Sequence, residues 1–95
     1  MIKLNNKEYK FKFGFKAMLN FENEEGVSVS SISDDFKMQT IVDMAYYAIN
    51  ATKDEITKDE IIDAIDADAS LIGIITKAIE KDMGALNLIE EEAKK

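Results

Sequence analysis

Apolar and polar residues alternate in two short stretches at the start of the chain. Residues 2–4 and residues 9–13 both follow the period of two that is typical of β-strands. The residues between them, 5–8, include two asparagines, which tolerate the positive φ angles of a tight turn. The pattern therefore predicts a β-hairpin over residues 1–14, with its apolar side chains on one face. The opposite face carries three lysines: Lys3, Lys10 and Lys12.

After Gly14 the apolar residues follow the spacing of amphipathic helices. Four helical segments are predicted, over residues 16–25, 35–50, 58–67 and about 69–84. The apolar stripe of the last segment continues through Leu86 and Ile89, so this segment is either one helix or two helices that meet at Gly84, the expected break. The serine-rich residues 27–33 also alternate apolar and polar residues, which is compatible with a short third strand, but a loop is the favoured interpretation.

The predicted helix ends carry residues that commonly cap helices. Thr57 and Glu60 have the spacing of a capping box ahead of the third helix. Gly26 can adopt the left-handed conformation that commonly ends a helix, and it follows the first helix. The expected N-caps of the other helices are Ser33 or Asp34 for the second and Asp68 for the fourth.

These elements predict an α+β fold in which an N-terminal β-hairpin precedes a bundle of four or five helices. The chain has 95 residues, which is the size of one domain. We therefore expect a single domain over residues 1–95, with the hairpin at 1–14 and the helical body at 15–93. A hairpin alone is only marginally stable in water, so the helices must cover its apolar face.

The second predicted helix is apolar nearly all round. Between residues 36 and 49 only Lys37, Gln39, Thr40 and Asp43 are polar. Such a helix lies either at the centre of the core or against a partner, and the sequence leaves both interpretations open. If it is shared with a partner, the expected apolar contact residues are Phe36, Met38, Met44, Tyr46 and Tyr47.

The composition excludes much enzyme chemistry. The chain has no cysteine and no histidine, so it cannot form disulfides, Cys/His zinc sites or a serine–histidine triad. Its acidic residues are numerous, but an EF-hand that began at Asp66 would have Leu71 in place of the required glycine. Asp43 stands alone on an apolar helix, where a structural role, either capping or pairing with a lysine, is a more economical explanation than catalysis. We expect no enzymatic activity, no cofactor and no metal.

Charge divides the chain into two parts. The net charge is -7, yet residues 1–16 hold five lysines and one glutamate, a balance of +4, which leaves -11 for residues 17–95. An acidic protein is a poor partner for nucleic acid, and no apolar run of 18 residues indicates a membrane span. The absence of a signal-peptide pattern in the first residues favours an intracellular location.

Two further function classes fit parts of the sequence. Asp68-Ala69-Ser70-Leu71 is similar to the Asp-Ser-Leu at which acyl carrier proteins are modified, so a group carrier modified on Ser70 is one alternative. Capping of the fourth helix explains the same segment more simply. The other alternative is an acidic inhibitor that imitates nucleic acid, which the net charge suggests.

The stretch from Ile2 to Met18, with its Tyr-x-Phe-x-Phe-Gly-Phe pattern at residues 9–15, resembles the start of tail assembly chaperones. These proteins belong to long-tailed phages that infect Gram-positive bacteria, and the lactococcal siphophage type is the most similar. The resemblance covers about the first 25 residues. The length, the acidity and the helical content of the remaining chain agree with it.

The resemblance implies a non-enzymatic function in the host cytoplasm. Members of this family coat the hydrophobic, helical tape measure protein, keep it soluble and help to present it to tail tube protein before they are released. A homo-oligomer is therefore expected, and oppositely charged ends would favour head-to-tail association into an open spiral. The hairpin lysines Lys3, Lys10 and Lys12 would take part in this self-association. The family also commonly makes a longer form by ribosomal frameshifting.

Overall fold

The computed structural model describes residues 1–26 and 37–85. It begins with an antiparallel hairpin of two strands, β1 (Ile2–Leu4) and β2 (Lys7–Tyr9), in which Ile2 pairs with Tyr9. The turn residues Asn5 and Asn6 have φ angles of 52° and 66°. Two consecutive positive φ angles give the tight turn whose twist matches that of the flanking strands, and asparagine accepts them more readily than most residues.

The second strand is shorter and begins earlier than the predicted stretch at residues 9–13. Because the turn has only two residues, pairing starts at Lys7, and it ends at Tyr9 because β1 is only three residues long. The backbone beyond β2 instead bonds to the helical part of the chain. The Lys12 N–H donates to the Ala48 carbonyl at 3.1 Å, and the Phe13 N–H donates to the Asp82 carboxylate at 2.8 Å.

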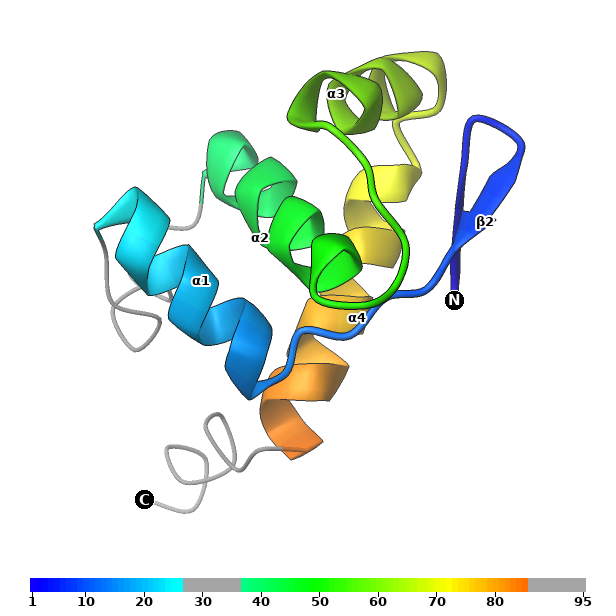
Figure 1. The fold of residues 1–95 in the computed structure, drawn as a ribbon. Coiled ribbons are helices and arrows are strands. Elements are labelled where there is room, and N and C mark those ends of the chain that lie inside the picture. The colour runs from blue at the N-terminus through cyan, green and yellow to red at the C-terminus, as the bar shows by residue number, and fades with distance from the viewer. Residues whose placement is uncertain (27–36, 86–95) are drawn as a thin grey trace.

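Four helices follow the hairpin in the described part of the chain (Figure 1). They are α1 (Phe15–Glu25), α2 (Met38–Asn50), α3 (Lys58–Ala67) and α4 (Leu71–Ala85). The predicted α+β fold, a hairpin followed by helices, is confirmed. Helix α3 has the predicted bounds, and the Thr57 hydroxyl accepts from the Glu60 N–H while Glu60 accepts from the Thr57 N–H.

Helices α1 and α4 begin at Phe15 and Leu71, within two residues of the predicted starts, whereas the start of α2 differs by three. Helix α2 begins at Met38 rather than at residue 35, because Lys37 has an extended backbone and its N–H donates to the Thr40 hydroxyl. The expected caps Ser33 and Asp34 and the loop at 27–33 lie outside the described residues. Helix α4 continues through Gly84 to Ala85, the last described residue, so it has no break at Gly84, and the continuation of the apolar stripe through Leu86 and Ile89 lies outside the described residues. A single glycine costs a helix only about 1 kcal/mol, which packing of the rest of α4 can offset.

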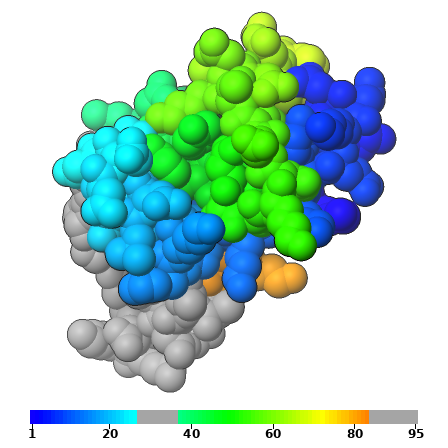
Figure 2. Space-filling model, in the orientation of Figure 1, coloured from blue at the N-terminus to red at the C-terminus, as the bar shows by residue number. Residues whose placement is uncertain are grey.

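Helix α2 lies at the centre of the fold and packs against α1, α3 and α4. The space-filling view shows the hairpin in blue and α1 in cyan on opposite sides of the green surface of α2 and α3 (Figure 2). Eight of the residues of α2 are buried, which explains why it is apolar on nearly every side. Of the two interpretations of this apolar helix, a place in the core is therefore correct for most of α2.

Three aromatic rings link the segment after the hairpin to α1 and α2. Phe21 makes edge-to-face contacts with Phe13 and Tyr47, with ring centroids 6.4 Å and 5.9 Å apart. Phe13 and Phe21 are almost completely buried. On the hairpin itself, Ile2, Leu4 and Tyr9 are buried as the alternating pattern predicts. The core thus extends from the hairpin to α1 through this row of rings.

Candidate functional site

The structure separates the apolar residues expected to contact a partner. Met38 is 65% exposed, and Tyr46 is half-buried. Met44 is 0% exposed and Tyr47 is 7% exposed, so both belong to the core and not to a partner surface. Phe36 lies outside the described residues. Of this set, Met38 and Tyr46 therefore remain available at the surface of the described chain.

An apolar groove of about 280 Å³ lies where α2, α3 and α4 meet. Seven side chains line it, and six of them are apolar. They are Met38, Gln39, Ile41, Val42, Ile62, Ile65 and Ile72. Met38 and Ile62 are the most exposed of the apolar members, at 65% and 44%. These two side chains therefore present apolar surface from facing helices.

Helical spacing explains how the groove forms. On α2, Met38 and Val42 are four residues apart, and on α3, Ile62 and Ile65 are three residues apart, so each pair lies on one side of its helix. The neighbouring Ile61 is buried in the core. Because Ile61 and Ile62 are both apolar, the apolar face of α3 is wider than the part that packs in the core. Ile62 lies on the part that is left over and lines the groove.

Sequence reasoning found Met38 but missed the isoleucines that α3 and α4 contribute. The signal was present, because Ile61 and Ile62 are adjacent and adjacent residues lie about 100° apart around a helix. A stripe that includes both is too wide for one buried face. What the sequence could not supply is the packing of α3 beside α2, which brings Ile62 close to Met38.

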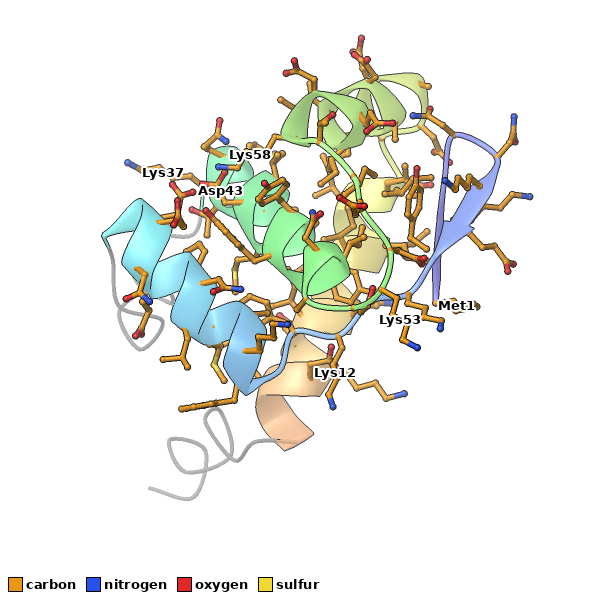
Figure 3. The ribbon with its side chains drawn as sticks, in the orientation of Figure 1. Met1, Lys12, Lys37, Asp43, Lys53 and Lys58 are labelled. Carbon is orange, nitrogen blue, oxygen red and sulfur yellow. The ribbon has the colours of Figure 1, made fainter. Side chains whose placement is uncertain are left out.

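A network of charged and polar side chains joins α1, α2 and α3 beside the groove. The Lys58 ammonium lies 2.8 Å from Glu25 Oε2 and 3.1 Å from Asp43 Oδ1. Figure 3 shows Lys58 and Asp43 pointing toward each other from neighbouring helices. The Tyr47 hydroxyl also donates to Glu25 Oε2, at 2.8 Å. The predicted pairing of Asp43 with a lysine is confirmed.

The groove and this network share a side chain. Gln39 lines the groove, and its amide donates to Asp43 Oδ1 at 2.9 Å. Lys58 is the first residue of α3, and its ammonium lies 5.4 Å from the centre of the Tyr46 ring. Lys58 thus joins the start of α3 to α2, the two helices that form facing walls of the groove.

The network shifts the pKa values of its members. Hydrogen bonds from Lys58 and Tyr47 hold the pKa of Glu25 below its ordinary value of 4.5. Burial lowers the pKa of Lys58, but its hydrogen bonds to Glu25 and Asp43 outweigh this effect and raise that pKa overall. Burial and the bond to Glu25 raise the pKa of Tyr47. Lys58 and Glu25 therefore stay charged, and Tyr47 stays neutral, through the neutral pH range.

Replacing Glu25 with glutamine should reduce the acid sensitivity of the fold. Because the pKa of Glu25 is lower in the folded state, its contribution to the unfolding free energy is present above pH 4.5 and lost as the pH falls below it. At pH 7 we expect Glu25→Gln to be less stable by about 1 to 2 kcal/mol. Urea unfolding between pH 7 and pH 3 should show this difference shrinking.

The neighbouring Glu24 provides the matched control for this measurement. Glu24 is exposed on the same helix, so Glu24→Gln should change the unfolding free energy little at any pH. A difference between wild type and Glu25→Gln that stays constant from pH 7 to pH 3 would contradict the role assigned to Glu25.

A second, more polar hollow of about 470 Å³ lies beside Tyr46, between α2 and the start of α3. Its amide and hydroxyl groups are used within the fold. Asn50 donates to the carbonyls of Tyr46 and Ile56, and Thr57 and Glu60 form the capping box. These hydrogen bonds hold the connection between α2 and α3 in place.

Ser70 and the acidic residues around it form a local turn. The Asp68 carboxylate accepts from the backbone N–H and the hydroxyl of Ser70, at 3.1 Å and 2.7 Å. This geometry supports the capping interpretation of the segment before α4. Within residues 1–26 and 37–85, no group of three or more acidic side chains is arranged to hold a metal ion.

The three lysines expected on the hairpin are all exposed. Lys3, Lys10 and Lys12 all lie at the surface, and the Lys10 backbone N–H donates to the Asp54 carboxylate at 2.6 Å. Lys3 lies in β1, whereas Lys10 and Lys12 follow the end of β2, so the expected single lysine face of a hairpin over residues 1–14 does not form as predicted. Contact between these lysines and another copy of the chain remains a prediction.

Among the lining residues that the structure describes, the groove has neither a nucleophile nor a titratable group, so what these residues offer is apolar contact. Gln39 is its single polar member, and that side chain is bonded to Asp43. None of the helices in the described residues combines the length and the apolar character that a membrane span needs. Comparisons with protein-family models, with curated proteins and with solved structures found no match.

Proposed function

We propose that this chain is a non-enzymatic tail assembly chaperone of a siphophage, which binds the apolar helical tape measure protein and keeps it soluble. The observation that carries the proposal is the apolar groove between α2, α3 and α4, where Met38 and Ile62 are exposed. The resemblance of the hairpin segment to that family supports it. Its place of action would be the host cytoplasm, with tail tube protein as a later partner.

The lining of the groove favours a helix over a small molecule. Pockets for small molecules usually combine apolar walls with several polar groups that fix the orientation of the ligand. Here the only polar lining residue is Gln39, which is bonded to Asp43. An amphipathic helix needs only apolar pockets for side chains at positions i, i+3 and i+4. The unbranched Met38 can adjust to different side chains along a repetitive partner.

The charge distribution supports coating by several copies. The exposed lysines of the hairpin and the acidic surface of the helices have opposite charge, which favours head-to-tail contact between copies. Such contacts are heterologous, and they build open spirals when the rotation between copies does not close. In this arrangement Lys3, Lys10 and Lys12 would meet the acidic body of the next copy, while the groove stays available to the tape measure protein.

Co-expression with the tape measure protein tests the proposal. Wild type should raise the soluble fraction of that protein and co-purify with it. Ile62→Glu, which places a carboxylate in the groove, should lose at least tenfold in affinity, because about 1.5 to 3 kcal/mol of apolar burial disappears. The matched control is Ile74→Glu, since Ile74 is 50% exposed on α4 but does not line the groove.

Two outcomes would contradict the proposal. If the tape measure protein stays insoluble with wild type, the chaperone function is wrong. If Ile62→Glu and Ile74→Glu weaken binding equally while both remain folded by circular dichroism, the groove is not the binding site.

A further inference from the structure

Carboxylates flank the apolar groove on its α3 side. Asp59 and Asp66 are both exposed, and they lie three residues before and four residues after Ile62. Residues at these spacings lie on the same side of a helix, so one aspartate precedes Ile62 along α3 and the other follows it. Asp63 is exposed at the next position around the helix. We call Asp59, Asp63 and Asp66 the α3 rim.

The α3 rim is not neutralised within the part of the chain that the structure describes. Lys58 is the only lysine on α3, and its ammonium lies against Glu25 and Asp43 instead. None of the three rim carboxylates is paired with a lysine of residues 1–26 and 37–85. Their negative charge therefore stands beside the groove, where a bound partner would meet it.

The two facing walls of the groove differ in charge. On the α2 wall, the exposed Met38 follows an exposed lysine, Lys37, and the polar Gln39 is bonded to Asp43. The α3 wall carries the rim. Basic groups of a partner would thus be attracted to the α3 side of the groove and not to the start of α2.

The spacing of the α3 rim indicates a pattern in the partner. Asp59 and Asp66 are seven residues apart on α3, which is two helical turns, or about 10 Å along the axis. A helix that lies along α3 with its apolar side in the groove would reach both aspartates with basic residues that are also two turns apart. These residues would follow one edge of its apolar stripe.

We propose that the groove selects amphipathic helices that carry lysine or arginine along the edge of the apolar stripe next to α3. Burial against Met38 and Ile62 supplies the affinity, and the α3 rim supplies the preference for a cationic helix and its orientation. This inference rests on the proposed function, because it names the chemistry of the tape measure segment that the groove binds.

Three model peptides test this preference with the full chain. Each is an amphipathic helix of about 18 residues, or five turns, with the same leucines on one side, and only the flanking residue differs: lysine, glutamine or glutamate. Fluorescence anisotropy of the labelled, monomeric peptides measures their affinity for wild type. We expect the lysine peptide to bind about tenfold more tightly than the glutamine peptide at low salt, and the glutamate peptide to bind most weakly. Salt at about 0.5 M should reduce these differences, because it screens exposed charges.

Paired variants separate the α3 rim from the net charge of the protein. Asp59→Asn/Asp66→Asn should lose most of the preference for the lysine peptide and keep its affinity for the glutamine peptide. The matched control, Glu8→Gln/Glu80→Gln, removes the same charge at exposed positions that do not line the groove, so it should keep the preference. Asp59→Lys/Asp66→Lys should reverse the preference, whereas a variant that had lost its fold would bind all three peptides poorly.

Three results would overturn the proposal. The first is equal affinity of wild type for the lysine and glutamate peptides. The second is an equal loss of preference in Asp59→Asn/Asp66→Asn and in Glu8→Gln/Glu80→Gln, which would assign the preference to overall charge. The third is a wild type that binds none of the peptides. The proposed function is judged separately, since co-expression measures whether the tape measure protein stays soluble, whatever the charge of its helices.

Discussion

Replacing Phe21 with alanine is expected to remove about 4 kcal/mol from the unfolding free energy. Phe21 is 2% exposed and its ring contacts Phe13 on one side and Tyr47 on the other. Alanine would leave a cavity between these rings and would separate α1 from the core. Because a domain of 95 residues has a total stability of about 5 to 14 kcal/mol, this variant should be largely unfolded at moderate urea concentration.

Phe15→Ala is the matched control for this experiment. It makes the same substitution on the same helix, but Phe15 is 69% exposed, so we expect a change within about 0.5 kcal/mol of zero. Urea unfolding followed by far-ultraviolet circular dichroism measures both variants. Equal losses from Phe21→Ala and Phe15→Ala would show that the row of aromatic rings does not hold α1 in place.

Replacing Lys58 with methionine is expected to cost about 2 kcal/mol. Methionine keeps most of the length of the side chain but leaves Asp43 and Glu25 without their shared cation. The side chain of Asp43 is only 11% exposed, whereas that of Lys58 is 35% exposed. The expected loss therefore lies between the roughly 0 to 1 kcal/mol of a surface pair and the roughly 3 to 5 kcal/mol of a fully buried one.

The position of Lys58 gives this variant a second effect. Since Lys58 ties the start of α3 to α2, its loss should loosen the walls of the groove and weaken partner binding even under conditions where the protein is fully folded. Lys77→Met on α4 is the control, because Lys77 is exposed and should contribute little. A Lys58→Met variant that unfolds at the same urea concentration as Lys77→Met would contradict the bridging role.

A double-variant cycle separates the pair from the rest of the network. Asp43→Asn removes the charge on α2 and leaves a side chain of similar size, and its combination with Lys58→Met measures the coupling between the two. We expect the double variant to be more stable than the sum of the single losses predicts, because neither charge is then left without its partner. If the losses of unfolding free energy in the two single variants are additive, Lys58 stabilises the fold through its contact with Glu25 and not through its contact with Asp43.

Local patterns predicted local structure well. The alternation at Ile2 and Leu4, the asparagines of the turn and the capping box at Thr57 all depend on neighbours within a few residues. The extent of β2 was wrong because the length of β1, and not the pattern of residues 9–13, limits the pairing. The start of α2 was wrong because the Lys37 N–H bonds to Thr40, an interaction that no apolar pattern reveals.

The candidate site was predicted only in part for a similar reason. Met38 could be identified because the second helix had more apolar residues than a small core needs. Met44 and Tyr47 lie on the same helix, and only their contacts with α1 and the rest of the core distinguish them from Met38. The contribution of α3 required knowing which helix packs beside α2. Lys58 likewise acquires its role from residues 15 and 33 positions away in the chain.

The hydrogen bond between the Phe13 N–H and Asp82 joins two residues that the ribosome adds to the chain at well-separated times. These residues are 69 positions apart, so at about 5 to 20 residues per second the ribosome needs about 3 to 14 seconds to connect them. Until Asp82 has emerged, Phe13 has no final neighbour at the end of α4. The contacts of Phe13, Phe21 and Tyr47 need only α1 and α2, whereas the Phe13 N–H reaches its acceptor only after translation has passed Asp82 in α4.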